Sequence, residues 1–163
     1  MLRFLGGFKF AAILLVLLAA AGCSKKNRPS LDAGAGEATP GSVAEFQTVV
    51  GDRIYFLVDQ SSLTPEAQAT LAKQADWLKQ YRNVTVQVEG HADERGTREY
   101  NIALSARRAT VTREFLAAQG IEPGRVTTIA FGKERPVALC DAESCWSQNR
   151  RAVTVVTGGA VSQ

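Results

Sequence analysis

The chain has 163 residues, of which 45% are hydrophobic and 21% are charged, and its formal net charge is +3 at pH 7. Residues 1–22 hold two basic residues and no acidic one, so the charge falls to +1 when they are set aside. A near-neutral remainder argues against nucleic-acid binding driven by bulk charge, and its length suits one domain with one hydrophobic core.

The first 22 residues have the features of an export signal. Arg3 and Lys9 precede an apolar run over residues 10–21. This run is too short to cross a bilayer as a helix, since about 20 residues are needed. Small residues then precede Cys23. This junction resembles a bacterial lipoprotein lipobox with Cys23 as the acylated residue, although Ala20 stands where Leu is usual. The alternative is ordinary secretory cleavage that leaves Cys23 as a free thiol.

The segment after Cys23 is expected to be a flexible linker. Residues 24–45 carry basic residues, proline and glycine but few large apolar side chains, so they bury too little surface to offset chain entropy. Ser24 is not Asp, and by resemblance to the enterobacterial sorting rule this implies delivery to the outer membrane. We therefore divide the chain into a signal peptide (1–22), a lipidated N-terminus and linker (23–45), a domain (46–158) and a tail (159–163).

Strands and helices are expected to alternate in the first half of the domain. Residues 53–58 are β-rich and predict a first strand. Thr64 and Pro65 indicate the start of a helix that ends near residue 81. Valines alternate with polar residues over 84–89, which predicts a second strand with one buried face.

The second half continues the alternation. Thr97 is a candidate cap for a helix of about 22 residues that ends at Gly120, and small residues on its inner face would let it lie close to a sheet. Two further strands are expected over 126–131 and 152–157, with a short helical piece over 141–148 between them. This order predicts an α/β fold, an α+β two-layer sandwich with a mixed sheet.

Two cysteines remain after Cys23. In an exported chain Cys140 and Cys145 are expected to form a disulfide. Residues five apart in one regular helix have Cα atoms roughly 8–9 Å apart, which is too far, so the bond requires a turn. The alternative is two buried free thiols. A zinc site is disfavoured because the chain has a single His.

The charged stretch after the second strand admits an enzymatic interpretation, which we weigh first. His91 is a candidate general base or metal ligand, with Asp93 and Glu94 beside it. No second His exists, and no Ser or Cys stands in a recognisable nucleophile motif. We therefore expect no enzyme activity, no metal and no cofactor, and we expect His91 to form a hydrogen bond in the turn after Gly90.

A binding function suits these residues better. Asp93 offers an acceptor for an ammonium group, and Arg108 on the following helix offers a planar fork for a carboxylate. Free N–H groups near Thr97 add donors. Together they suit a zwitterion with separated amine and carboxylate groups. The alternative is that Asp93, Arg98 and Arg108 only form salt bridges with one another.

Four motifs carry a resemblance to a known family. They are GHADERGT at 90–97, NIALSARRA at 101–109, GKERP at 132–136 and NRRAV at 149–153. Over about residues 51–157 the chain resembles the OmpA-like peptidoglycan-binding domain in the form found in peptidoglycan-associated lipoproteins. The resemblance implies βαβαββ order with a four-stranded mixed sheet and helices packed on one face.

The resemblance also implies a ligand. The family binds the stem peptide of peptidoglycan non-covalently through diaminopimelate, and Asp93 and Arg108 stand where the family holds the amine and the carboxylate of that residue. Asn101, Arg95 and Thr97 lie where neighbouring contacts are made. The domain would then tether the outer membrane to the cell wall.

Partners follow from the same resemblance. The Tol-system proteins TolB and TolA are expected partners, and the function is expected to support envelope integrity and cell division. The alternative is a module that binds Tol partners without direct wall binding. One departure concerns the first strand, where the family has Phe-Asp-x-Asp and this chain has Leu57 in place of the first acid.

Overall fold

The computed structural model describes residues 38–162. The expected signal peptide, the acylation site Cys23 and the linker up to residue 37 lie outside the described residues. Within residues 38–162 no helix is long and apolar enough to span a membrane. The elements are α2 (Val43–Glu45), η1 (Phe46–Gly51), β1 (Arg53–Tyr55), α3 (Pro65–Gln80), β2 (Thr85–Gly90), α4 (Arg98–Ala118), η2 (Pro123–Arg125), β3 (Val126–Ala130), α5 (Glu143–Asn149) and β4 (Arg151–Gly158).

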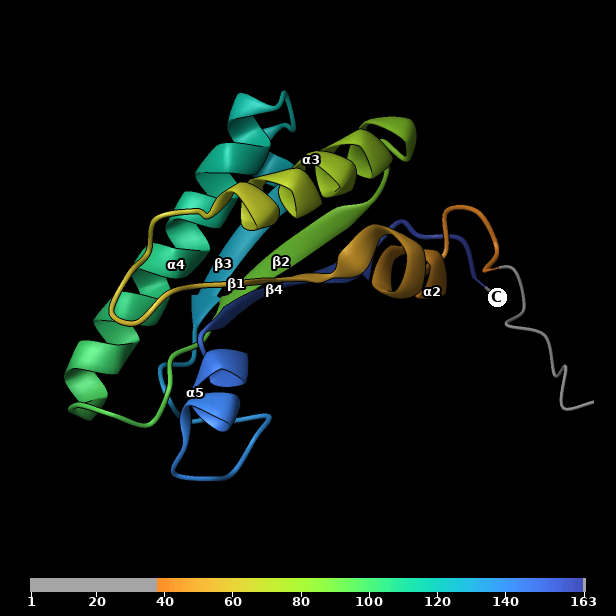
Figure 1. Cartoon of the computed structure of the whole chain (residues 1–163). Helices are drawn as coiled ribbons and strands as arrows, with labels where there is room; N and C mark the ends of the chain where they lie inside the picture. Colours follow the sequence, from red (N-terminus) through yellow and green to blue (C-terminus); the bar gives the residue numbers. More distant parts are fainter. Residues whose placement is uncertain (1–37, 163) are drawn as a thin grey trace, which may run out of the picture. The chain divides into compact units, whose positions relative to one another are not determined.

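The four strands form one mixed sheet in the order β1-β4-β2-β3. β2 pairs with β3 in parallel and with β4 antiparallel, and β1 pairs antiparallel with β4. Figure 1 shows α3 and α4 across the same face of this sheet. The predicted α/β class, the mixed four-stranded sheet and the βαβαββ order are confirmed, with α5 inserted before the last strand.

Alternation in β2 decides which face of the sheet carries the core. Val86 and Val88 are fully buried, whereas the intervening Thr85 and Gln87 are half-buried on the other face. Helix α3 begins as expected: Thr64 accepts a hydrogen bond from the Ala67 N–H, and Pro65 follows it. Burial of its apolar face against the sheet then supplies most of its stability.

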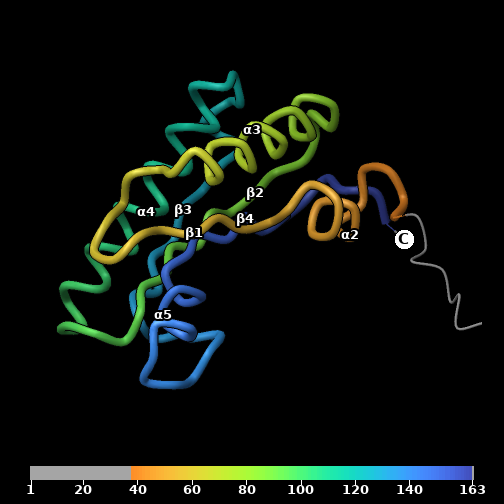
Figure 2. The backbone as a smooth tube through the Cα atoms, viewed as in Figure 1, coloured from red at the N-terminus to blue at the C-terminus, as the bar shows by residue number. Residues whose placement is uncertain are grey.

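The fold extends beyond the predicted limits 46–158 at both ends. Helix α2 begins at Val43, and Glu45 accepts a hydrogen bond from the indole of Trp77 at 2.7 Å. Ser42 pairs with Val161 in an isolated bridge, so the two ends of the described chain lie side by side (Figure 2). Residues at each limit therefore belong to the packed domain, because Ser42 is fully buried at one end and Ala160 packs against the hydrophobic core at the other.

The first strand is shorter than predicted. β1 ends at Tyr55, and the chain then turns, with Asp59 in a left-handed conformation at φ 59°. The turn makes Leu57 and Val58 exposed and directs backbone carbonyls inward toward α4. The β-rich composition of residues 53–58 predicted a strand up to residue 58. Instead the carbonyls of Leu57 and Gln60 accept hydrogen bonds from Arg108 on α4.

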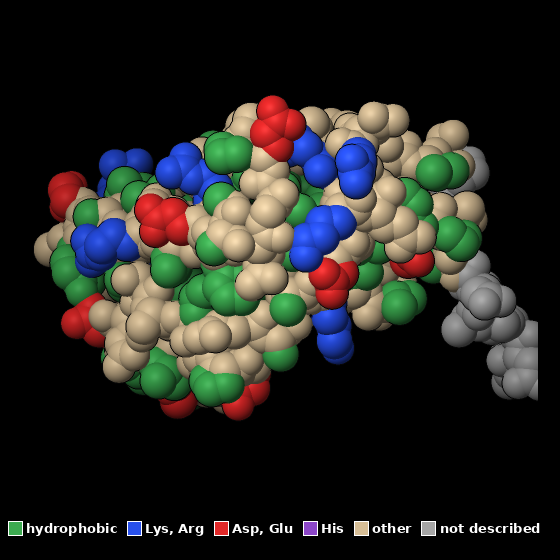
Figure 3. Space-filling view, turned by 90° about the horizontal axis from the view of Figure 1, so that it is seen from above, with side chains coloured by type: hydrophobic (Ala, Val, Ile, Leu, Met, Phe, Trp, Pro, Cys, Tyr) green, Lys and Arg blue, Asp and Glu red, His purple; other side chains and the backbone are tan. Residues whose placement is uncertain are grey.

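Charges on one face of the molecule are mixed in sign. Figure 3 shows basic and acidic side chains interspersed over one face of the molecule. Such a distribution lacks the continuous positive stripe that is typical of nucleic-acid binding.

Candidate functional site

Gly90 allows α4 to lie directly on the sheet and so positions the charged loop that follows. A Cβ at this position would come 1.9 Å from the backbone oxygen of Ser105. Only a residue without a side chain fits such a contact. Ser105, Ala109 and Thr112 are buried on the facing side of the helix, which confirms the predicted small face. The end of β2 and the start of α4 therefore meet at a fixed angle, with residues 91–97 between them.

Arg108 is the largest fully buried side chain of the described residues, at 0% exposure. Its guanidinium donates to the carbonyl oxygens of Gln60 and His91, each at 2.8 Å, and to that of Leu57 at 3.3 Å. Burial lowers the pKa of Arg108 to about 10, and the nearby Asp93 opposes this shift. The side chain remains charged at neutral pH and joins the turn after β1 to the loop after β2.

Asp93 is only 8% exposed and carries two guanidinium partners. Arg95 binds its carboxylate at 2.6 Å, and Arg150 binds it at 3.3 Å. Burial by itself would raise the pKa of Asp93, but hydrogen bonds from Arg95 and Arg150 outweigh it and the pKa is lowered. The carboxylate is therefore ionised at neutral pH.

The alternative in which the charged residues only pair with one another is wrong. Arg98 forms its ion pair with Glu134 at 2.9 Å, and Arg108 donates to backbone carbonyls. Asp93 takes its two partners from its own loop and from the end of α5. Each of these three side chains therefore has its own set of partners, and none of them forms an ion pair with another.

Arg150 links Asp93 to the rest of the domain. Its side chain is 5% exposed and donates to the carbonyl of Phe56 at 3.1 Å and to the carboxylate of Glu143. It belongs to the NRRAV motif at residues 149–153, which is part of the family resemblance. Its contact with Asp93 spans 57 residues of sequence, so only the tertiary structure identifies it.

His91 does not form the side-chain hydrogen bond that we expected. The ring is 2% exposed, and neither ring nitrogen has a hydrogen-bond partner in the described part of the chain. Nε2 lies 3.6 Å from a carboxylate oxygen of Glu89, and the ring stacks on Phe131 with centroids 5.4 Å apart. Burial, together with the positive charges of Arg151 and Arg135, lowers the pKa of His91 to about 4. The neutral ring packs against Phe131. The backbone of His91 makes the polar contacts: its N–H donates to the Arg151 carbonyl, and its own carbonyl accepts from Arg108.

A pocket of about 300 Å³ opens between the turn after β1, the loop after β2 and the first turns of α4. We call it the Asp93 pocket. It is lined by Val58, Asp59, Asp93, Arg95, Gly96, Tyr100, Asn101, Leu104 and Arg108.

Four of the five predicted ligand-binding residues line the Asp93 pocket, and Thr97 is outside its lining. Asn101 donates from its side chain to the backbone oxygen of Arg95 at 2.8 Å, which fixes the loop. Thr97 caps α4 by accepting from the Tyr100 N–H at 3.2 Å. Leu57 also lies outside the lining and exposes its side chain, so its backbone oxygen is what contacts the site.

Tyr100 and Asp59 are pocket residues that the sequence did not single out as ligand contacts. The Tyr100 hydroxyl donates to the Asp59 carboxylate across 41 residues of sequence. This contact closes one side of the Asp93 pocket. A signal was present for Tyr100, which stands between the motifs at 90–97 and 101–109, whereas no motif covers Asp59.

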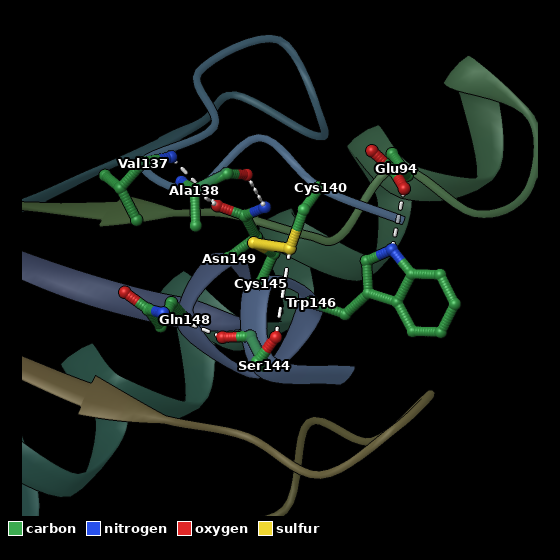
Figure 4. The surroundings of a disulfide bond; sticks show 9 residues. All are labelled: Glu94, Val137, Ala138, Cys140, Ser144, Cys145, Trp146, Gln148 and Asn149. Carbon is green, nitrogen blue, oxygen red and sulfur yellow. Dashed lines mark hydrogen bonds between the residues drawn. A yellow bond between two sulfur atoms is a disulfide. The ribbon is translucent and has the colours of Figure 1, made fainter. Parts of the chain in front are cut away.

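The segment before β4, which includes α5, packs against the charged loop of residues 91–97. Cys140 and Cys145 are bonded, with Cα atoms 5.6 Å apart, and Cys140 lies before α5 rather than within it. Figure 4 shows the Trp146 indole on the same helix donating to Glu94, at 2.6 Å. The Arg95 guanidinium lies 4.2 Å from the centre of the Trp146 ring. The disulfide-bonded segment thus contacts the loop that carries Asp93.

Within residues 38–162 no group of three or more His, Cys, Asp or Glu side chains is arranged to hold a metal ion. The site instead offers one buried cation and one buried anion on a shared pocket. Such an arrangement binds small charged groups by hydrogen bonds and ion pairs.

Comparisons with known proteins identify the family of the chain. The model of the OmpA family matches residues 55–151. A peptidoglycan-associated lipoprotein of Brucella melitensis is 58% identical over 91% of each chain, and one of Mesorhizobium japonicum is 57% identical over 89% of each chain. The crystal structure of the peptidoglycan-associated lipoprotein from Burkholderia pseudomallei is 39% identical, covers 65% of this chain and 90% of that chain, and superposes with a TM-score of 0.64. The chain belongs to the OmpA family, which is not an enzyme family, and within it to the peptidoglycan-associated lipoproteins.

Proposed function

We propose that this domain binds peptidoglycan non-covalently through the diaminopimelate residue of the stem peptide. Asp93 accepts the ammonium group of that residue, and Arg108 donates to its carboxylate. The observation that carries this proposal is the pair of opposite buried charges that line one pocket of about 300 Å³. The names of the relatives from Brucella and Burkholderia, which are peptidoglycan-associated lipoproteins, support the same ligand.

Arg108 has donors left for a ligand. A guanidinium carries five N–H groups. Three of them donate to the backbone oxygens of Leu57, Gln60 and His91. Arg108 lines the Asp93 pocket, and in this proposal its two remaining N–H groups donate to the ligand carboxylate, where low local dielectric strengthens a charged hydrogen bond. Because the backbone contacts fix the guanidinium in place, little side-chain entropy is lost when the ligand binds.

Other side chains give the pocket its shape. Asn101 and Arg95 line it beside the two charges, and Val58, Tyr100 and Leu104 provide apolar surface. A zwitterion on an aliphatic chain suits this lining, because its charged ends find partners while its methylene groups contact apolar atoms. Thr97 remains a predicted neighbouring contact.

The wider role follows from tethering. Cys23 is acylated and anchored in the outer membrane, the linker supplies reach, and the domain holds the cell wall from the periplasm. Holding both ends raises the local concentration of wall near the domain, so a modest affinity is sufficient. The Tol proteins TolB and TolA contact the same domain, and the assembly supports envelope integrity during cell division.

The wall-binding proposal is tested by sedimentation of the full chain, in detergent, with purified peptidoglycan. Asp93→Asn keeps the size of the side chain but removes its charge. Its affinity should fall about tenfold or more, because one charged hydrogen bond is lost. Free meso-diaminopimelate should displace the wild-type protein, whereas lysine, which lacks the second carboxylate, should not.

The matched control is Asp76→Asn, which neutralises the acid of an exposed ion pair with Lys79 on α3. This variant should sediment like the wild type. Equal sedimentation of the Asp93 variant and its control would refute the site. A wild-type chain that fails to sediment with peptidoglycan yet binds TolB would favour the pure interaction module.

A further inference from the structure

The Asp93 carboxylate is occupied within the protein by two arginines, and these differ in freedom. The Arg150 side chain is 5% exposed and is held by the Phe56 carbonyl and by Glu143. The Arg95 side chain is 39% exposed. A ligand ammonium that pairs with Asp93 must share that carboxylate with both guanidinium groups. Arg95 is the one that can move, since it has the greater exposure and its other side faces a ring rather than a carboxylate.

That ring belongs to Trp146. The Arg95 guanidinium carbon lies 4.2 Å from the ring centre, within the range of a cation–π contact. The indole is itself oriented, because its N–H donates to Glu94 at 2.6 Å, as Figure 4 shows. Glu94 and Arg95 are neighbours in the loop. Trp146 therefore contacts the loop at two consecutive residues, one by a hydrogen bond and one by its face.

The helix that carries Trp146 is held independently of the pocket. The disulfide between Cys140 and Cys145 closes the segment before it. The side chain of Asn149 bonds three backbone groups, the N–H groups of Val137 and Ala138 and the carbonyl of Ala138. With both ends of α5 restrained, the indole is a fixed surface against which Arg95 can rest.

We propose that Trp146 is a positioning residue for the ligand: its ring holds the Arg95 guanidinium when the ammonium of diaminopimelate takes its place on Asp93. This inference rests on the proposed function. Arg95 stays near the pocket as a cation, where it balances Asp93 and the adjacent Glu94 and Glu143 without blocking the ammonium. Trp146 itself lies outside the lining of the Asp93 pocket and acts through Arg95.

The test is a double-mutant cycle, read as affinity of the full chain for a soluble muropeptide that contains meso-diaminopimelate. Trp146→Leu should weaken binding about three- to fivefold, which is the size of one exposed cation–π contact. In the background of Arg95→Met the same substitution should have no further effect. A merely structural role of Trp146 would weaken binding equally in both backgrounds, and that result would overturn the inference.

Phe131→Leu is the matched control. Phe131 is also a half-buried ring beneath an arginine, with the Arg135 guanidinium 3.7 Å from its centre, but Arg135 does not bind Asp93. This control should change affinity by less than about 1.5-fold. The double variant Cys140→Ser with Cys145→Ser provides a second route, because it frees α5 and keeps the indole. It should weaken binding only when Arg95 is present.

The outcomes separate this inference from the function on which it rests. If the wild type binds the muropeptide and Asp93→Asn does not, the site stands whatever Trp146 does. Unchanged affinity in Trp146→Leu would then overturn the positioning role alone. A wild type without measurable affinity would overturn the proposed function, and the positioning role with it.

Discussion

Two arginines at opposite ends of the domain perform the same structural task, yet only one of them takes part in the candidate site. Arg108 donates to three backbone oxygens from the turn after β1 and the loop after β2. Arg125, next to the start of β3, donates to the backbone oxygens of Leu78, Tyr81 and Val84 at 2.8–3.0 Å. Both use the planar fork to satisfy carbonyls that no secondary structure pairs.

Each arginine also lines a pocket, and the two pockets have similar volumes of about 300 Å³ and 310 Å³. The Arg125 pocket adds Lys79, Arg82 and the exposed Glu122, whereas the Asp93 pocket adds a carboxylate that is 8% exposed. An arginine that binds carbonyls is therefore a feature of the fold. A buried opposite charge beside it is what distinguishes the candidate ligand site.

Removal of the Arg108 fork should have the largest effect. Arg108→Met leaves the carbonyls of Gln60 and His91 without their donor and removes the proposed carboxylate partner, whereas the Leu57 carbonyl keeps its hydrogen bond from the Gln60 N–H. We expect a loss of about 3–5 kcal/mol in the free energy of unfolding, because each orphaned carbonyl costs roughly 1–3 kcal/mol. Urea denaturation measures it, and wall binding should be lost in the fraction that stays folded.

The neighbouring Arg107→Met serves as control, since Arg107 is exposed on the same helix. A stability change below about 1 kcal/mol in the Arg108 variant would contradict the structural role assigned to its fork.

Arg125→Met should lower the stability of the domain and leave its affinity for peptidoglycan unchanged. The variant leaves the carbonyls of Leu78 and Val84 without their arginine donor, whereas the Tyr81 carbonyl keeps its hydrogen bond from the Val84 N–H, and the expected loss is about 2–3 kcal/mol. Affinity for peptidoglycan should equal that of the wild type when both are measured well below the unfolding temperature. A large drop in affinity would mean that the two ends are coupled and that the Asp93 pocket is not self-contained.

A smaller loss of stability is expected when the pH is lowered, because His91, near the Asp93 pocket, is buried in its neutral form. The ordinary pKa of 6.5 falls to about 4 in the folded protein, so the unfolded chain binds a proton between these values and the folded chain does not. Stability is complete above pH 6.5 and declines as the pH falls toward 4. We expect a loss of about 2 kcal/mol, below the full linkage value because the Glu89 carboxylate, 3.6 Å from Nε2, stabilises the ring once it is protonated.

The variant His91→Phe sharpens this test. It keeps the ring that stacks on Phe131 and loses no side-chain hydrogen bond, because neither ring nitrogen of His91 has a partner in the described residues. The difference in unfolding free energy between variant and wild type should grow as the pH falls from 6.5 to 4. Parallel curves for the two proteins would show that His91 does not titrate in this range.

Local signals were enough for the elements and for the outline of the site. The alternation of valines in β2 and the Thr64 and Thr97 caps acted within a few residues, so the order of strands and helices followed from them. Asp93 and Arg108 stand inside long motifs, and their opposite charges were sufficient to predict a zwitterionic ligand. The cysteine pair was likewise readable from its number and compartment.

Tertiary structure alone decided how those charges are held. The partners of Arg108 lie 17 to 51 residues away, and the partner arginine of Asp93 at the end of α5 lies 57 residues away. No local periodicity encodes contacts of that range, because they depend on which carbonyls the turn after β1 leaves unpaired. The same reason explains His91: its sequence context suggested a hydrogen bond, but its ring is buried where neither nitrogen has a hydrogen-bond partner among residues 38–162. The sequence by itself thus determined which charged groups the corner carries, and packing decided which of them stay free to meet a ligand.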